Sequence, residues 1–272
     1  MVYTQVSVRG LNEEQKELLI ALLSVEGYEG FEETPDALNA FIPAPDFNER
    51  ALGELLVRTG GSYTIQEIQE TNWNKEWESN FEPVTIGDFC VIRADFHAPQ
   101  PGTAHEIIIT PKMSFGTGHH ATTQMMIRQM RHLVFTGRKV LDFGTGTGVL
   151  AILAEKLGAS QVLAIDNDEW SISNTLENMD RNAAGFQVRQ GSLEVARGER
   201  FDIILANINR HILLAYAAEL RSLITAGGTL LLSGLLEEDK EVVVPAYEEA
   251  GFKLQADDNE GKWIALLFQP VS

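Results

Sequence analysis

The sequence contains a single cysteine, Cys90, among its 272 residues. A lone cysteine excludes an internal disulfide and any zinc site built from several cysteines. The chain also lacks an apolar run long enough to cross a bilayer, and its first residues lack the basic and apolar regions of a signal peptide. We therefore expect a cytoplasmic protein with no membrane partner.

Positive charge is scarce as well, because 21 Lys and Arg residues stand against 39 Asp and Glu, for a formal net charge of −18. A strongly acidic surface repels phosphate backbones, so we expect no direct specificity for nucleic acids. Such a surface attracts basic proteins. The same charge is equally consistent with a role in solubility alone. The composition thus permits a protein substrate without establishing one.

The length favours two compact units over one. We expect a small N-terminal domain over residues 1–68, a linker over residues 69–81 and a larger domain over residues 82–272. The linker contains Trp73 and Trp77, which a helix would place on one face. These two rings either pack the joint between the domains or line a substrate groove, and the tendency of aromatic rings to be buried favours packing.

The first 68 residues have the pattern strand, helix, strand, strand, helix, strand. Asn12 with Gln15, and Asp46 with Glu49, resemble capping boxes that open the two helices. The order is typical of a ferredoxin-like α+β fold. No nucleophile–base pair and no metal-ligand spacing is present, so we assign this domain to binding or structure. The expected strands cover residues 2–8, 28–33, 38–42 and 63–68.

From residue 122 onward, helical patterns alternate with apolar strands, which is typical of a doubly wound α/β domain with a parallel sheet. We expect helices over residues 122–133, 149–157, 169–181, 211–224 and 237–250. The intervening strands cover residues 139–143, 162–166, 186–190, 201–206 and 229–233. Two closing strands, near residues 252–255 and 263–268, are expected to form an antiparallel edge. Two further strands, 89–95 and 106–110, precede this alternating pattern.

The most specific feature is a strand that runs into three alternating glycines, Gly144, Gly146 and Gly148. Glycines permit a tight turn and close approach to a ligand. The spacing G-x-G-x-G differs from the dinucleotide pattern G-x-G-x-x-G. Asp142 also precedes the first glycine, where it would repel a pyrophosphate. S-adenosylmethionine carries a sulfonium and an ammonium but no phosphate, so we predict that Asp142, Gly144 and Gly146 bind this cofactor.

Two later strand ends support the same site. Asp166 lies about 20 residues beyond the glycine turn, where a carboxylate accepts hydrogen bonds from ribose hydroxyls. An alternative role is a helix N-cap, but Asp168 is the better cap candidate. Asn207 ends the strand that begins near residue 201, which would bring its amide beside the transferred methyl group. The alternative for Asn207 is a turn or cap residue, although Asn209 suits that role better.

The segment from Phe115 to Thr123 carries two adjacent histidines. His119 and His120 are candidate metal ligands or bases, but neighbouring side chains point apart and no carboxylate lies nearby in sequence, so we expect no metal. We predict instead a loop over the cofactor. Phe115 would pack near the adenosine, and Thr123 would cap the next helix and touch the methionine end of the cofactor.

The chain resembles the bacterial methyltransferases that modify ribosomal protein L11. The resemblance is carried by residues 114–123, the linker tryptophans, residues 142–148 and residues 206–208. The resemblance covers nearly the whole chain and is weaker over residues 1–68. The family usually has Thr where His119 stands, Pro where Ala121 stands and often Leu where Asn209 stands. These departures put the shape of the acceptor site in doubt but not cofactor binding.

The resemblance implies cofactor contacts from Thr123, Gly144, Asp166 and Asn207. It also implies an N-terminal domain that captures the ribosomal protein, with lysine or N-terminal amines methylated repeatedly. We expect a monomer in which Asn207 orients the amine, and we identify no catalytic base. The alternatives are a methyltransferase acting on another protein, an RNA or a small molecule, and a binding module without catalysis.

Overall fold

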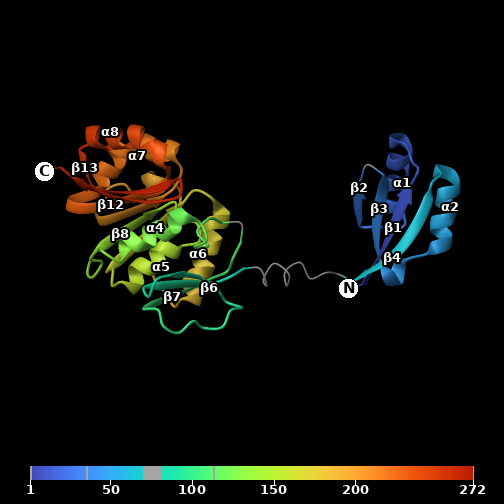
Figure 1. The fold of residues 1–272 in the computed structure, drawn as a ribbon, viewed down its shortest axis with the longest axis horizontal. Coiled ribbons are helices and arrows are strands. Elements are labelled where there is room, and N and C mark those ends of the chain that lie inside the picture. The colour runs from blue at the N-terminus through green and yellow to red at the C-terminus, as the bar shows by residue number, and fades with distance from the viewer. Residues whose placement is uncertain (1, 35, 70–80, 113, 272) are drawn as a thin grey trace. The chain divides into compact units, whose positions relative to one another are not determined.

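The computed structural model describes residues 2–34, 36–69, 81–112 and 114–271. The chain divides into two compact units, Met1–Asn80 and Phe81–Ser272 (Figure 1). Trp73 and Trp77, like most of the predicted linker, lie outside the described residues. Within the described ranges, no helix is long and apolar enough to cross a membrane.

The first unit is a four-stranded antiparallel sheet with two helices. Both helices contribute leucines to a core with Val6 and Val8 of the first strand. The strand order β2-β3-β1-β4 is compatible with the predicted ferredoxin-like topology. The elements are β1 (Val2–Arg9), α1 (Glu13–Val25), β2 (Gly30–Glu33), β3 (Ala37–Pro43), α2 (Glu49–Thr59) and β4 (Ser62–Gln69).

The two helix caps of this unit differ in how well the sequence predicted them. Asn12 caps α1, and the capping box with Gln15 is present, with both hydrogen bonds at 2.9 Å. The predicted cap Asp46 is wrong, because it lies in a short 3-10 turn, and Asn48 caps α2 by accepting hydrogen bonds from the Arg50 and Ala51 amides. A cap must directly precede the first helical turn, and Asp46 stands two residues too early.

The second unit is built on a seven-stranded sheet of order β10-β9-β8-β11-β12-β14-β13. Helices α7 and α8 contribute to the core on one face of this sheet, and α4 and α5 contribute to the core on the other. This is the predicted doubly wound α/β arrangement (Figure 1). Its strands are β8 (Lys139–Phe143), β9 (Gln161–Asp166), β10 (Gln187–Gln190), β11 (Phe201–Asn207), β12 (Ile224–Leu236), β13 (Phe252–Glu260) and β14 (Trp263–Pro270). Its helices are α4 (Ala121–Met130), α5 (Val149–Lys156), α6 (Glu169–Arg181), α7 (Arg210–Leu223) and α8 (Lys240–Glu249).

The closing strands lie together at one end of the sheet, as the sequence predicts. β13 and β14 pair antiparallel, as expected, but β14 inserts between β12 and β13 and also pairs antiparallel with β12. β13 therefore lies at this edge of the sheet, and β10 lies at the opposite edge. The insertion brings the start of β14 toward the middle of the sheet, a consequence of strand pairing that no local pattern encodes.

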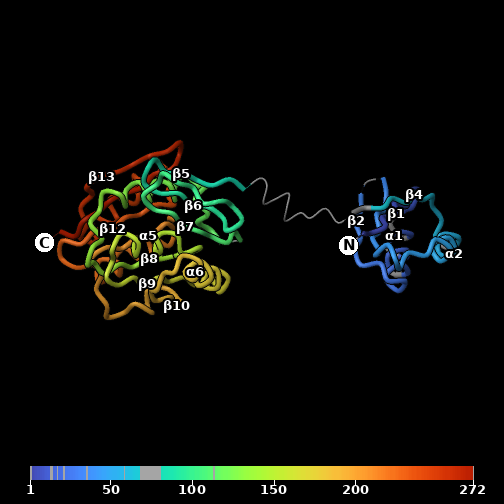
Figure 2. The backbone as a smooth tube through the Cα atoms, turned by 90° about the horizontal axis from the view of Figure 1, so that it is seen from below, coloured from blue at the N-terminus to red at the C-terminus, as the bar shows by residue number. Residues whose placement is uncertain are grey.

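A second, three-stranded sheet consists of β5 (Val84–Ile86), β6 (Cys90–Ala94) and β7 (His105–Ile109) (Figure 2). Helix α6 supplies side chains to the free edge of β7. Asn182 accepts from the Ile108 amide at 2.9 Å and donates to the Ile108 carbonyl at 2.6 Å. Asn178 accepts from the Thr110 amide at 2.7 Å, and Asn174 donates to the Thr110 carbonyl at 3.1 Å. We call these three side chains the asparagine ladder.

Candidate functional site

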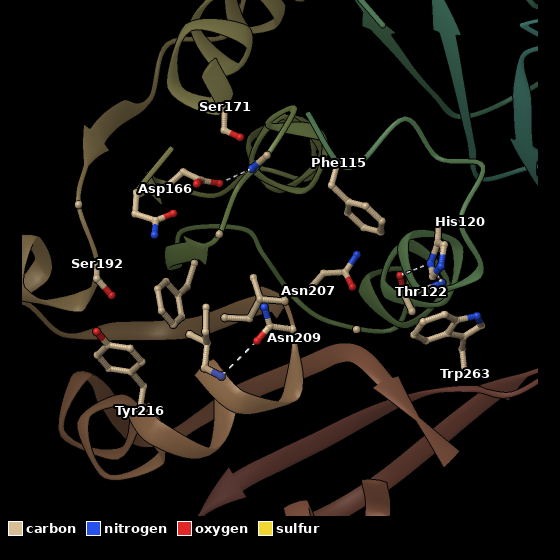
Figure 3. A pocket seen from close by; sticks show the side chains of 18 residues that line it. Phe115, His120, Thr122, Asp166, Ser171, Ser192, Asn207, Asn209, Tyr216 and Trp263 are labelled. Carbon is tan, nitrogen blue, oxygen red and sulfur yellow. Dashed lines mark hydrogen bonds between the residues drawn. The ribbon is translucent and has the colours of Figure 1, made fainter. Parts of the chain in front are cut away.

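A cavity of about 610 Å³ lies at the carboxyl ends of β8, β9 and β11 (Figure 3). This is the position where open α/β sheets bind ligands. Of the residues predicted to bind the cofactor, Phe115, Gly144, Gly146, Asp166 and Asn207 line the cavity. The structure thus brings together side chains and backbone that are separated by up to 92 positions in the sequence.

The glycine turn requires glycine for reasons that are visible in the fold. Gly144, Gly146 and Gly148 have φ values of +74°, +57° and +80°, a region that L side chains rarely adopt. A Cβ on Gly144 would lie 2.2 Å from a methyl group of Ile208, and one on Gly146 would lie 2.3 Å from the Phe115 carbonyl oxygen. Neighbouring loops, and not only a ligand, therefore approach this backbone closely.

The loop before α4 is fastened to the glycine turn by Thr147. The Thr147 amide donates to the Phe115 carbonyl at 2.9 Å, and its hydroxyl donates to the Gly116 carbonyl at 2.7 Å. These bonds hold Phe115 at the cavity with half of its surface exposed. The loop that we predicted over the cofactor therefore rests on the turn that forms the cavity floor.

Asp166, at the end of β9, carries the only carboxylate among the described residues that line the cavity. Its Oδ2 accepts from the Gly146 amide at 2.9 Å, and its Oδ1 accepts from the Asp168 amide at 3.1 Å. Asp168 caps α6 by accepting from the Ser171 amide at 3.0 Å, as predicted. Asp166 is consequently free of the capping role, and each of its oxygens keeps a lone pair for a ligand.

Asp142, in contrast, lies beneath the turn and is not part of the cavity lining. Only 1% of its surface is exposed. Its Oδ2 accepts from the Thr145 hydroxyl at 2.6 Å, whereas its Oδ1 has no partner among the described residues. Burial raises the pKa of Asp142 to about 7. The arrangement points to a role in holding the turn, whereas the sequence predicted a cofactor contact.

Asn207 ends β11 near the middle of the cavity (Figure 3). Its amide nitrogen donates to the Thr123 hydroxyl at 3.3 Å, while its Oδ1 is buried without a hydrogen-bond partner in the described part of the chain. Thr123 is fully buried and supports Asn207 from below the cavity surface. Asn209 caps α7 by accepting from the Ile212 amide, as predicted, so Asn207 offers an unused acceptor to a ligand.

Three rings enclose one end of the cavity, which we call the three-ring end. The His120 ring lies 5.2 Å from the Phe115 ring and 4.5 Å from the Trp263 ring, edge to face in both cases. Figure 3 shows the three rings beyond Asn207, away from Asp166 and Tyr216. This end is therefore aromatic, whereas the other end carries the carboxylate.

His120 caps α4, a role that we had predicted for Thr123. The His120 Nδ1 accepts from the Thr122 amide at 3.3 Å and lies 2.7 Å from the Thr122 hydroxyl. Burial, followed by the charge of Lys262, lowers the pKa of His120. The ring is neutral, and because Nδ1 accepts, its proton lies on Nε2. His120 thus has no free lone pair with which to act as a base.

The sequence of the chain matches the sequence model of one protein family, described as ribosomal protein L11 methyltransferase (PrmA), over residues 11–270. A ribosomal protein L11 methyltransferase from Porphyromonas gingivalis is 42% identical over 264 residues, which cover 94% of this chain and 91% of that protein. One from Chlorobaculum tepidum is 38% identical over 268 residues, covering 93% and 92%. The chain belongs to the ribosomal protein L11 methyltransferase family.

A solved structure within this family agrees with the fold. The ribosomal protein L11 methylase of Lactobacillus delbrueckii subsp. bulgaricus superimposes with a TM-score of 0.67 at 29% identity, covering 71% of this chain and 100% of that one. A 16S rRNA methyltransferase of T. thermophilus gives a TM-score of 0.51 at 21% identity, over 58% of this chain and 45% of that one, and supports the fold alone. The resemblance inferred from the sequence motifs is confirmed.

The sequence analysis missed several residues that line the cavity of this family member. Ser192 follows β10, where the crevice rule would have indicated it. Trp263 and Tyr216 belong to no motif, and only the strand insertion and the packing of α7 bring them to the cavity. Gly234 has a φ of +82°, and a Cβ there would lie 2.3 Å from the Ile208 carbonyl oxygen.

The two histidines of the loop face different neighbours. The His119 ring packs against Phe81 with centroids 4.6 Å apart, whereas the His120 ring packs against Trp263. Among the residues that the structure describes, no three His, Cys, Asp or Glu side chains converge as metal ligands. Both histidine rings of the loop therefore pack against aromatic side chains.

Proposed function

We propose that this protein transfers methyl groups from S-adenosylmethionine to amino groups of ribosomal protein L11. Membership in the family and the names of the relatives support the reaction and its substrate. One observation carries the proposal at the level of chemistry. A carboxylate, Asp166, and an unpartnered amide oxygen, on Asn207, stand in one cavity on either side of the glycine turn that follows β8.

The residues of the cavity fit this cofactor. The Asp166 carboxylate suits two ribose hydroxyls, and the exposed backbone of Gly144 and Gly146 suits the close approach of the amino-acid part. None of the described lining residues is lysine or arginine, so phosphate groups would find no cationic partner. When it is bound, S-adenosylmethionine supplies a methyl group that is already activated by the positive sulfonium.

The residues of the chain act mainly by positioning a neutral amine. The Asn207 Oδ1 accepts a hydrogen bond from an N–H of the amine and thereby directs its lone pair. Thr123, bonded to the Asn207 nitrogen, holds this amide in the required orientation. The three-ring end surrounds the amine with apolar surface, which favours the uncharged form. The proton of the amine passes to water, since His120 uses its lone pair in capping α4.

The energy needed to reach the neutral amine depends on the amine. For a lysine side chain at pH 7 it is about 4–5 kcal/mol, and for an N-terminal α-amine about 1 kcal/mol. Exclusion of water at the three-ring end reduces both values. One site can therefore methylate lysine and N-terminal amines repeatedly, and we propose both as acceptors.

The first unit is the proposed region for capturing the substrate. Residues 1–80 carry 15 Asp and Glu against 5 Lys and Arg, whereas residues 81–272 carry 24 against 16. The acidic excess is thus concentrated in the smaller unit, and it suits a basic ribosomal protein. We propose that residues 1–68 bind the substrate, that residues 69–81 connect the units and that residues 82–272 catalyse transfer in a cytoplasmic monomer.

The proposal is tested by calorimetry with S-adenosylmethionine and by labelling with its radioactive methyl group. We expect binding of one cofactor per chain, and label in recombinant ribosomal protein L11 but not in ribosomal RNA. Mass spectrometry of ribosomes from cells with and without the protein would then identify the methylated amines. Absence of cofactor binding, or label in the RNA alone, would overturn the proposal.

A further inference from the structure

An exposed lysine, Lys262, lies beside the three-ring end. Lys262 immediately precedes Trp263, in the turn between β13 and β14, and is exposed. Its Nζ lies over the Trp263 ring, 5.6 Å from the ring centroid. Within the described residues Lys262 forms no ion pair. The ammonium therefore lies close to a ring that lines the cavity.

Lys262 and Trp263 have acidic residues nearby. The Glu237 amide donates to the Lys262 carbonyl at 2.9 Å. Glu260 lies opposite Trp263 in the register of β13 and β14, and both Glu260 and Asp258 accept hydrogen bonds from Arg128. The carboxylate of the cavity, Asp166, lies beyond Asn207 at the other end (Figure 3).

Two further titratable groups belong to the same surroundings. Asp142 is buried beneath the glycine turn, and Tyr216 lies at the end opposite to the three rings (Figure 3). The charged group that acts on the His120 ring is Lys262. One ring of the three-ring end therefore carries a positive charge beside it, although the protein as a whole is strongly acidic.

We propose that Lys262 is a positioning residue for methyl transfer, because its ammonium, held over Trp263, disfavours a charged amine at the three-ring end and favours the neutral amine that reacts. The inference rests on the proposed function. Like charges placed close together raise the free energy of the protonated form, so the amine loses its proton to water more readily. Lys262 itself forms no bond with the substrate and exchanges no proton.

The test compares kcat as a function of pH for the wild type and for Lys262→Met, Lys262→Glu and Lys262→Arg, with ribosomal protein L11 as the acceptor. We expect kcat at pH 7 to fall about threefold for Lys262→Met and about tenfold for Lys262→Glu, as a surface charge near the amine would produce. At a pH above the pKa of the bound amine, kcat should equal that of the wild type, because the profile is shifted and not lowered. Lys262→Arg should behave as the wild type, KM should not rise, and high salt should reduce the differences.

A second readout needs neither substrate nor activity. The pKa of His120, followed by nuclear magnetic resonance, should rise in Lys262→Glu, because the positive charge that opposes protonation of this ring is replaced by a negative one. Lys253→Glu is the matched control. Lys253 is exposed at the other end of the hairpin, opposite Gln269, and its substitution changes the net charge equally.

Three results would overturn the inference. The first is a pH profile of Lys262→Glu that coincides with that of the wild type. The second is an equal loss of kcat at every pH in all three variants, which would indicate a structural role. The third is a shift in Lys253→Glu as large as that in Lys262→Glu. If no amine is methylated at all, the proposed function fails, while the His120 titration still decides whether Lys262 acts on this end of the cavity.

Discussion

Two aspartates at the ends of neighbouring strands, Asp142 on β8 and Asp166 on β9, have the same chemistry and opposite positions. Asp142 lies opposite Ala164 in the sheet, so Asp166 stands two residues nearer to the end of its strand. That difference carries Asp166 into the cavity and leaves Asp142 beneath the turn with 1% of its surface exposed. A short displacement along a strand thus separates a carboxylate available to a ligand from one that holds the backbone.

Both aspartates nevertheless act on the same turn. The Thr145 hydroxyl donates to Asp142, and the Gly146 amide donates to Asp166, so two successive residues are bonded to two different strands. The glycine turn is therefore held by two carboxylates, Asp142 of the strand that precedes it and Asp166 of the neighbouring strand. Substitutions in the turn and in each aspartate should therefore have distinct and separately measurable effects.

The largest effect is expected for Gly146→Ala. Its φ of +57° and the 2.3 Å that would separate an added Cβ from the Phe115 oxygen leave no room for a methyl group. We expect a loss of roughly 3 kcal/mol or more in the free energy of unfolding, together with loss of cofactor binding. Urea unfolding and calorimetry measure the two quantities.

The matched control is Gly137→Ala. Gly137 has a φ of +74° but nothing within 4 Å of the added carbon, so only the backbone cost of about 1 kcal/mol applies. Equal losses in the two variants would show that close approach at Gly146 is unimportant.

The next effect separates the two aspartates by their contribution to affinity. In Asp166→Ala two charge-assisted hydrogen bonds to the ribose are lost, so we expect S-adenosylmethionine to bind about 100-fold more weakly. Asp166→Asn, which keeps one acceptor, should lose less. Asp142→Asn should change the affinity by less than about threefold, because Asp142 does not reach the cavity. Calorimetry at pH 8 measures the affinity for S-adenosylmethionine. A similar loss of affinity in the Asp142 and Asp166 variants would show that the two aspartates do not differ in their contribution to cofactor binding.

The third effect is a pH dependence that belongs to Asp142 alone. Its pKa is about 7 in the folded protein against 3.8 ordinarily, so the folded state holds a proton that the unfolded state has lost. Stability is therefore highest below the unfolded pKa and falls as the pH rises toward 7, by about 2–4 kcal/mol. Urea unfolding of the wild type and Asp142→Asn at pH 5 and pH 8 tests this. The stability of the variant relative to the wild type should increase with pH, and parallel behaviour would count against a buried, protonated Asp142.

The smallest effect is expected for Thr145→Val, which removes the one side-chain hydrogen bond of Asp142. The ionised carboxylate depends on this donor more than the protonated form does, so we expect a loss of about 1–2 kcal/mol at pH 8 and less at pH 5. The same unfolding experiment measures it, with pH 5 as the internal control. A loss that does not change with pH would mean that Thr145 acts through packing alone.

Local patterns in the sequence predicted much of this site. The glycine turn, the strand ends at Asp166 and Asn207, and the caps Asp168 and Asn209 all follow from residues that lie next to one another. Each of these features is decided by a backbone conformation or hydrogen bond within a few positions, which is why the pattern was informative.

Three features escaped prediction because distant contacts decide them. The burial of Asp142 depends on its register with β9, which the sequence does not state. Helix α4 begins at Ala121, so His120 caps it and Thr123 lies in the first turn, where its hydroxyl accepts from Asn207, 84 residues away. Trp263 reaches the cavity only because β14 inserts between two other strands.

The asparagine ladder on α6 has a consequence for the behaviour of the protein at high concentration. A strand at the border of a sheet ordinarily presents unpaired amides and carbonyls that a second molecule can extend, which begins aggregation. Here Asn174, Asn178 and Asn182 occupy those groups at Ile108 and Thr110. At these two residues the β7 border of the small sheet is thereby closed to foreign strands by side chains of the same chain.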